Sequence, residues 1–345
     1  MRIVWPPQVP DELLSSYLTR VSIAYGTSPH KLMTLYAPGF QVWTRDIDVC
    51  ASEALLRCLE YPSGKSLQML NGLTLAGWNE VTRRSADPPQ GVYHWINSIG
   101  VLHRTRRRHG LAFCTKCLAQ DGAYLRQWRL SFWTVCPLHQ ELLQDACPVC
   151  GAVVQPHRHG FDVRMCWHCN RSLTASASAA TEVSHLQSFL FRCLMNPTKE
   201  FEFSGHACRG AEVLWGGDAL LSALKPACRT LSMGSERGPR IEMRRLPERH
   251  ADMALLAHLL SLGPAALVAK AKSMSVTQRC FRQQMPPWIE RLVEQLPEGR
   301  IRPVPVSNRS ELRSAGEAQR KRTNGWREMR ADVLLKMIGR SNEYR

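Results

Sequence analysis

Residues 114–151 read CTKCLAQDGAYLRQWRLSFWTVCPLHQELLQDACPVCG. They contain three pairs of residues of the types that bind metals, and Cys-Trp-His-Cys at 166–169 adds a fourth pair. Two residues separate the members of each pair, and gaps of 18, 7 and 15 residues separate the pairs. Zn²⁺ takes four nitrogen or sulfur ligands in a tetrahedron, and a Cys-x-x-Cys turn presents two of them to one ion. We therefore expect two zinc ions per chain, with these ligands: Cys114, Cys117, Cys136 and His139; Cys147, Cys150, Cys166 and Cys169.

Other interpretations of these cysteines fit the sequence less well. Thirteen cysteines are too few for a disulfide scaffold in 345 residues, and their odd number leaves one unpaired. No strand-helix-strand pattern provides the context of a thioredoxin-type redox site. Four strong ligands leave no position for an activated water, so we expect structural sites. The pairing order stays open, because an interleaved cross-brace would use the same residues as consecutive pairing.

The chain before this stretch has the pattern of short helices. Residues 11–25 repeat apolar side chains every three or four positions, at Leu14, Leu18, Val21 and Tyr25. Gly26 ends this helix, and Ser28 with Pro29 forms an N-cap and first-turn pair for a second helix. Two helices across a turn with Gly are typical of a helix-turn-helix unit, although structural helical hairpins share the pattern.

These patterns predict a mainly α-helical protein with four segments. Residues 1–113 are expected to form a helical, helix-turn-helix-like domain, and residues 114–173 a tandem zinc-finger or zinc-ribbon module. The small polar run at 174–182 (TASASAATE) is typical of a linker. Helical periodicity returns after it, which predicts a C-terminal helical domain at 174–299. Residues 300–345 have twelve Lys or Arg against five Asp or Glu and are expected to be a basic tail.

The charge of the chain indicates a polyanionic partner. Lys and Arg exceed Asp and Glu by 16, and the pI is about 9.6. Nucleic acid is the first candidate for such a partner, and an anionic membrane surface is the second. A hydrophobic content of 44% excludes global disorder, and no apolar run reaches the roughly 18 residues that span a bilayer. We therefore expect a folded, cytoplasmic protein that binds DNA and no membrane.

Two basic stretches are candidates for DNA contacts. HRTRRRHG at 103–110 places four arginines directly before the first cysteine pair, where they could contact phosphates: Arg104, Arg106, Arg107 and Arg108. A solvated charged face is the alternative for this stretch. SMSVTQRCFRQQ at 273–284 predicts a recognition helix that starts at Ser275 and carries side chains suited to base edges and phosphates: Thr277, Gln278, Arg279 and Arg282.

Two separated motifs resemble the TniQ family of transposon target-selection proteins. In the stretch quoted first, the family's elements occur in order: Cys114–Leu118 (Cys-x-x-Cys-Leu), Trp128–Leu130 (Trp-Arg-Leu), Cys136–His139 (Cys-Pro-x-His), Leu142–Leu143, and Cys147–Gly151 (Cys-Pro-x-Cys-Gly). The opening WPPQVPDELLSSYLTRVSIAYG at 5–26 is similar to the family's N-terminal signature, in which prolines and Glu-Leu-Leu-Ser-Ser lead into the first helix. The resemblance covers about residues 5–170.

This resemblance implies a non-enzymatic adaptor of bacterial transposition, associated with the nucleoid when it is bound to DNA. Such a protein selects a target site, directly on DNA or through a CRISPR effector or other recognition complex, and links it to an AAA+ ATPase of the TnsC or TniB type and to the transposase. A homodimer is compatible with it. Trp5 and Tyr17, beside Pro6 and Pro7, are expected to anchor a partner, with packing on the domain's own core as the alternative.

No catalytic residues are expected. The single phosphate-loop candidate, SGKS at 63–66, has Leu59 where the leading Gly belongs, and no strand precedes it. Zinc-protease, serine-hydrolase and dinucleotide-binding motifs do not occur. A zinc-containing transcriptional regulator that binds DNA is the alternative function, while the closed metal sites oppose a metalloenzyme. The residues do not decide whether target choice is sequence-specific or guided by RNA.

Overall fold

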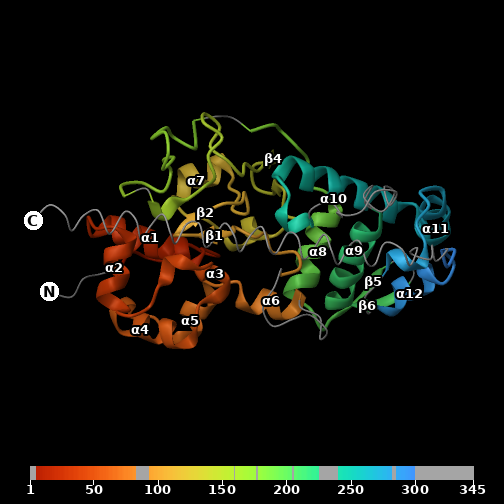
Figure 1. Ribbon diagram of the computed structural model, residues 1–345, viewed down its shortest axis with the longest axis horizontal. Helices are drawn as coiled ribbons and strands as arrows, with labels where there is room; N and C mark the ends of the chain where they lie inside the picture. The colour runs from red at the N-terminus through yellow and green to blue at the C-terminus, as the bar shows by residue number, and fades with distance from the viewer. Residues whose placement is uncertain are drawn as a thin grey trace, which may run out of the picture. The chain divides into compact units, whose positions relative to one another are not determined.

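Short helices with capped N-termini form the N-terminal part of the structure (Figure 1). The structure is a computed structural model, and it describes residues 5–82, 93–158, 160–175, 178–203, 206–224, 240–281 and 285–299. Ser28, Ser52 and Ser66 each accept a hydrogen bond from a backbone N–H three residues on and so start three of the helices. The N-terminal helices are α1 (Leu14–Ala24), α2 (Pro29–Tyr36), α3 (Ile47–Cys50), α4 (Glu53–Ser63), α5 (Leu67–Gly72) and α6 (Ala76–Thr82), with a 3₁₀ turn at Val42–Thr44.

Helix α1 is buried on its polar side as well as on its apolar side. Ser15 Oγ donates to Asp48 Oδ2 at 2.8 Å, and Ser16 Oγ donates to Glu12 Oε1 at 2.9 Å. These bonds satisfy hydroxyls that would otherwise be costly to bury. Gly26, with φ at +60°, lies in the turn that follows α1, and α2 begins after this turn as predicted. The expected pair of helices across a Gly-containing turn is therefore present.

Two-residue strands and turns dominate the middle of the chain. The hairpin β1 (Val101–Leu102) and β2 (Thr105–Arg106) is antiparallel, and so is the hairpin β3 (Val135–Cys136) and β4 (Glu141–Leu142). Helix α7 (Thr115–Asp121) and 3₁₀ turns at Arg126–Arg129 and Pro156–Arg158 complete this part. The short elements are held by the aromatic side chains between them, including Trp95, Trp128 and Phe132, each at most 1% exposed.

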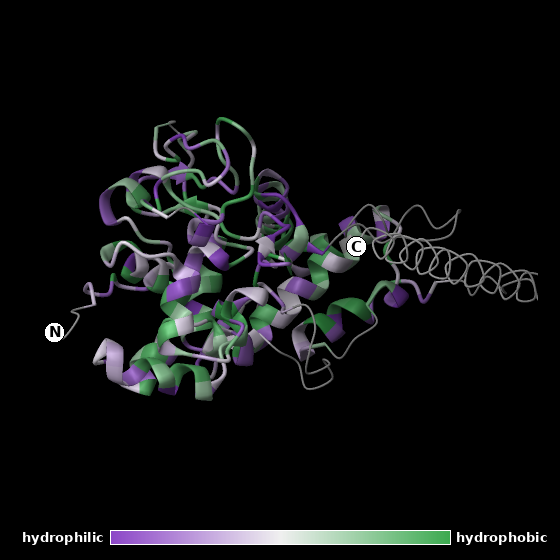
Figure 2. Ribbon diagram, turned by 60° about the vertical axis from the view of Figure 1, so that its left-hand side comes forward, coloured by the Kyte–Doolittle hydropathy of each residue, from purple (hydrophilic) through white to green (hydrophobic). Residues whose placement is uncertain are grey.

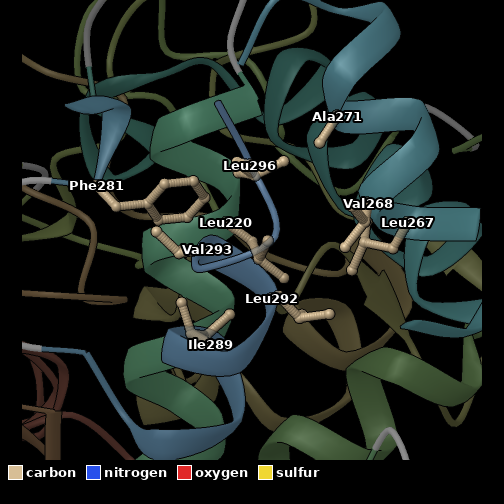
Figure 3. Close-up of a pocket in the computed structure, with 9 residues that line it drawn as sticks. All are labelled: Leu220, Leu267, Val268, Ala271, Phe281, Ile289, Leu292, Val293 and Leu296. Carbon is tan, nitrogen blue, oxygen red and sulfur yellow. The ribbon is translucent and has the colours of Figure 1, made fainter. Parts of the chain in front are cut away.

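Helices return after residue 184. Helices α8 (His185–Met195) and α9 (Gly210–Leu224) lie side by side (Figure 1), joined by the antiparallel strands β5 (Glu200–Phe203) and β6 (His206–Arg209). The remaining elements are a 3₁₀ turn (Ile241–Met243), α10 (Leu246–Ser261), α11 (Gly263–Ser273), a 3₁₀ turn (Gln278–Cys280) and α12 (Pro287–Val293). Figure 2 shows hydrophobic and hydrophilic residues alternating along the helices of the structure. A small apolar pocket lies between α9, α11 and α12, lined by Leu220, Leu267, Phe281, Ile289 and Leu296 (Figure 3).

The buried side chains form two clusters. One lies among α1–α5 and includes Tyr17, Leu56 and Trp43. The other runs through the middle and C-terminal parts, from Leu13 to Leu296. The described residues up to Glu298 belong to one compact unit, and the division into four segments stays a prediction. The basic tail predicted at 300–345 lies outside the described residues. The mainly α-helical class with two central cysteine clusters is confirmed. None of the described helices is long and apolar enough to cross a membrane.

Candidate metal centres

The first metal centre joins helix α7 to the β3–β4 hairpin. Cys114 is the N-cap residue of α7 and Cys117 lies in its first turn. Cys136 ends β3, and His139 lies in the hairpin turn that follows, where Gln140 N donates to Cys136 O at 2.8 Å. Each Cys-x-x ligand pair is thus placed by a local turn, and the hairpin brings the two pairs together.

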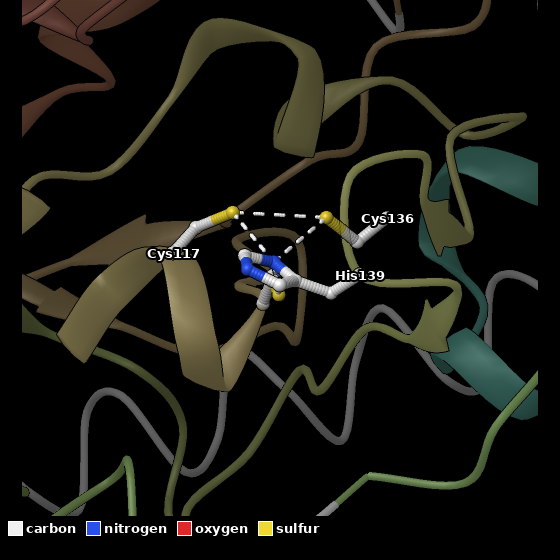
Figure 4. A group of neighbouring side chains, drawn as sticks. Cys117, Cys136 and His139 are labelled. Carbon is white, nitrogen blue, oxygen red and sulfur yellow. Dashed lines mark hydrogen bonds between the residues drawn. The ribbon is translucent and has the colours of Figure 1, made fainter. Parts of the chain in front are cut away.

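The distances in this centre suit a tetrahedral ion. His139 Nδ1 lies 3.3 Å from Cys114 Sγ, 3.2 Å from Cys117 Sγ and 3.6 Å from Cys136 Sγ (Figure 4). Cys117 Sγ and Cys136 Sγ are 3.6 Å apart. A zinc tetrahedron with ordinary bond lengths has edges of about 3.6 Å from nitrogen to sulfur and about 3.8 Å between sulfurs. The four atoms therefore fit one Zn²⁺, with Nδ1 as the nitrogen ligand.

The second metal centre has four sulfurs from two similar turns. Cys147 Sγ lies 3.7 Å from Cys169 Sγ, and Cys150 Sγ lies 3.7 Å from Cys166 Sγ. In the first turn Gly151 N donates to Cys147 O, and in the second Asn170 N donates to Cys166 O. Gly151 and Asn170 both have positive φ, at 69° and 55°, a conformation that Gly adopts freely and Asn tolerates.

The structure resolves the pairing order that the sequence left open. The ligand atoms of 114, 117, 136 and 139 all lie within 4.8 Å of one another, and so do those of 147, 150, 166 and 169. Consecutive pairs therefore share a centre, without interleaving. Two nearby histidines, His157 and His168, belong to neither ligand group, and a third, His159, lies outside the described residues.

The crowded thiols need a cation in order to ionise together. Hydrogen bonds from Cys114 and Cys117 lower the pKa of Cys136 to about 2, while hydrogen bonding to Cys114 and Cys136, together with burial, raises the pKa of Cys117 far above its usual range. In the second centre, burial raises the pKa of Cys166 to about 12. One thiolate in each group suppresses the ionisation of its neighbours, and a bound Zn²⁺ removes this penalty by coordinating all four ligands.

The four arginines of 103–110 do not share one environment. Arg104, Arg107 and Arg108 are exposed, whereas Arg106 is 4% exposed and donates from Nη2 to Ser15 Oγ at 3.3 Å. The expectation that Arg106 contacts phosphate is corrected, because its guanidinium lies inside the protein near Asp48. Arg104 and His103 form the turn between β1 and β2, both with positive φ.

The expected recognition helix at 275–284 is absent from the described residues. Helix α11 ends at Ser273, Ser275 has φ of +57°, and Gln278–Cys280 is one 3₁₀ turn that starts after Thr277. The Gln278 side chain donates to the carbonyl oxygens of Glu294 and Leu296, so its amide is bonded to the backbone that follows α12. Of the four candidates in this stretch, Arg279 is exposed, and Arg282 lies outside the described residues.

Trp5 and Tyr17 are buried in the N-terminal core. Trp5 is 7% exposed, and its ring centroid lies 5.8 Å from that of Tyr17 and 5.6 Å from that of Tyr36. Tyr17 is fully buried. The expectation of exposed partner anchors is corrected, because both large rings are used by the chain's own packing. Burial is also the main reason that the pKa of Tyr17 rises to about 12.

A buried ion network joins Arg129 to two aspartates of the N-terminal part. Arg129, fully buried, donates to Asp46 and to Asp48 Oδ2, and to the backbone oxygen of Asn97 at 2.8 Å. Asp48 in turn accepts from Ser15 N and Oγ at 2.8 Å. Arg129 belongs to the Trp-Arg-Leu motif and Ser15 to the Glu-Leu-Leu-Ser-Ser motif, so these two motifs meet in the core.

Sequence reasoning missed two groups of side chains. His30 on α2 and Arg158 lie beside the β1–β2 turn: Arg104 Nη1 is 3.4 Å from His30 Nε2, and Arg158 Nη1 donates to Thr105 Oγ1 at 2.8 Å. His94, Asp218 and Glu242 form a third buried group of possible metal ligands. Both groups bring together residues that are distant in the sequence, so no local spacing pattern could predict them.

Residues 3–143 match the family model TniQ. The match confirms the resemblance over these residues, which include the N-terminal helices and the first metal centre, while the Cys147–Gly151 element lies beyond it. It supports a role in transposition for this part of the chain. No curated protein matches the chain.

Proposed function

We propose that this chain, with a TniQ domain over residues 3–143, is a non-catalytic adaptor that selects target sites for transposition. In this role it contacts target DNA, directly or through a recognition complex, and recruits an AAA+ ATPase and through it the transposase. Two Zn²⁺ ions, one in each cysteine centre, hold the middle of the chain in shape. The family match supports the adaptor role, and the closed ligand sets support structural metal.

An exposed basic surface supports the contact with DNA. This surface is called here the β1–β2 surface, and it consists of five residues: His30, Arg104, Arg107, Arg108 and Arg158. All five side chains are exposed. Within the described residues, no carboxylate forms an ion pair with any of its arginines. Unpaired arginines on one surface are what phosphate contacts require, and release of counterions from DNA supplies the free energy.

Binding to duplex DNA across a salt series tests this surface. Changing Arg104, Arg107 and Arg108 together to Ala is expected to lower the slope of log K against log salt by up to about 2.7, because each phosphate contact contributes about 0.9. Arg57→Ala is the matched control, since Arg57 is also exposed but pairs with Glu53 on α4. An unchanged slope in the triple variant contradicts a DNA contact by this surface.

Recruitment is tested by mixing the purified chain with its cognate AAA+ ATPase, nucleotide and DNA. Co-assembly is expected, without ATP hydrolysis or DNA cleavage by the chain alone. A chain that binds an operator sequence and never the ATPase would instead be a zinc-containing transcriptional regulator. Hydrolysis or cleavage by the chain alone, with contaminants excluded, would contradict the adaptor role.

A further inference from the structure

Three buried side chains from distant parts of the sequence meet outside the two cysteine centres. His94 precedes the segment that leads to β1, Asp218 lies on α9, and Glu242 lies on the 3₁₀ turn Ile241–Met243. One ligand atom of each lies within 4.8 Å of the other two. Their exposed fractions are 3%, 5% and 1%. An imidazole nitrogen and two carboxylate oxygens are thus directed at one small buried space.

The contacts of His94 Nδ1 conflict with one another. Nδ1 lies 3.0 Å from Asp218 Oδ2 and 2.7 Å from Arg240 Nη2. If Nδ1 carries a proton, the proton suits Asp218 but faces a guanidinium donor. If Nδ1 is bare, it accepts from Arg240 but its lone pair faces a carboxylate oxygen. No protonation state of the ring satisfies both neighbours, whereas a cation bound by Nδ1 and Oδ2 satisfies both atoms.

Glu242 adds a buried oxygen that makes no hydrogen bond. Its Oε1 accepts from Trp95 N at 2.9 Å. Its Oε2 has no hydrogen-bond partner among the described residues, and the nearest cationic atom is Arg240 Nε at 3.5 Å. A buried carboxylate oxygen without a hydrogen bond is costly even beside this one cation, and burial and the neighbouring Asp218 raise the pKa of Glu242. The Arg240 side chain is 40% exposed, so it can turn toward solvent when another cation takes its place.

We propose that His94, Asp218 and Glu242 bind a third metal ion, a divalent first-row transition metal for which Zn²⁺ is the reference. One imidazole and two carboxylates are ligands that Zn²⁺ accepts, and three protein ligands leave a position for water. The imidazole disfavours Mg²⁺ and Ca²⁺, which prefer sites made of oxygens alone. The ion ties the segment before β1 to α9 and to the 3₁₀ turn at 241–243, and it neutralises two buried carboxylates.

Metal analysis of the full chain tests the site. The protein is incubated with Zn²⁺ and separated from free metal, and its zinc is measured per chain. Three equivalents are expected for the unchanged protein and two for Glu242→Gln, because the cysteine centres retain theirs. Asp252→Asn is the control: Asp252 pairs with Arg244 at 3.0 Å and belongs to no ligand group, so this variant should keep three. Two equivalents in the unchanged protein would overturn the proposal.

A second variant separates a metal site from a simple ion-pair cluster and does not depend on Glu242→Gln folding. Arg240→Gln removes the competing cation. A metal site then binds Zn²⁺ more tightly, measured as a lower Kd in competition with a zinc-sensitive dye, and the thermal midpoint rises when Zn²⁺ is added. An ion-pair cluster loses its counter-ion instead, so the midpoint falls and added Zn²⁺ does not restore it. That second result refutes the site.

Discussion

His157 should make the stability of this protein depend on pH. The imidazole stacks on Trp43 with ring centroids 5.0 Å apart and planes 3° apart. Nε2 lies 3.3 Å from Arg104 O, while the buried Nδ1 has no hydrogen-bond partner. A second ring proton would therefore have no acceptor. Burial, and after it the charge of Arg106, lower the pKa of His157 from 6.5 to about 3.

The sign and size of the effect follow from this lowered pKa. Between pH 6.5 and 3 the unfolded chain binds a proton at His157 that the folded chain does not, so stability falls as the pH falls. Each pH unit in that window changes the free energy of unfolding by about 1.4 kcal/mol. When the pH falls from 7.5 to 5.5, the free energy of unfolding decreases by about 1.4 kcal/mol through His157, because only the interval from pH 6.5 to 5.5 lies below the pKa of the unfolded chain.

Urea unfolding of the unchanged protein and of His157→Phe, followed by Trp fluorescence at pH 7.5 and 5.5, measures this loss. Phe keeps an aromatic ring against Trp43 but takes no proton. Acid also weakens the zinc sites, but it does so in both proteins, so the difference between the two pH effects isolates His157. We expect the unchanged protein to lose about 1.4 kcal/mol more than the variant. Equal losses in the two proteins would refute the reasoning.

Three further changes probe the packing and the metal. Gly216→Ala places a Cβ 2.1 Å from Cζ2 of Trp288, so we expect a loss of about 1–3 kcal/mol from overpacking, read from the thermal midpoint. Arg129→Met removes the guanidinium that pairs with the buried Asp48 and the half-buried Asp46 and should cost about 3–5 kcal/mol in urea unfolding; a change under about 1 kcal/mol would mean that the network contributes little. Cys150→Ser should lower the zinc content by one equivalent and make the middle of the chain sensitive to protease, whereas Cys58→Ser should do neither.

Local spacing in the sequence was enough to predict the two groups of possible metal ligands, which the fold brings together, and several helix starts. The geometry of a Cys-x-x-Cys pair or of a Ser N-cap depends on a few neighbouring residues, so the local sequence is enough to predict it. The mainly helical class and the TniQ resemblance follow from the same kind of local pattern. The pairing of the ligand pairs needed the hairpin and the turns of the folded chain.

Tertiary structure alone decided which charged side chains face solvent and which lie inside. In the run at 104–108, Arg106 lies in β2 and is buried, whereas Arg104 lies in the turn before β2 and Arg107 follows the strand, so both stay exposed. The stretch at 275–284 has polar residues suited to DNA, but its described part, 275–281, forms only one 3₁₀ turn, and its Gln278 side chain bonds to the carbonyl oxygen of Leu296. His94, Asp218 and Glu242 come together only through packing of distant segments, because contacts between residues far apart along the chain leave no periodic signal in the sequence.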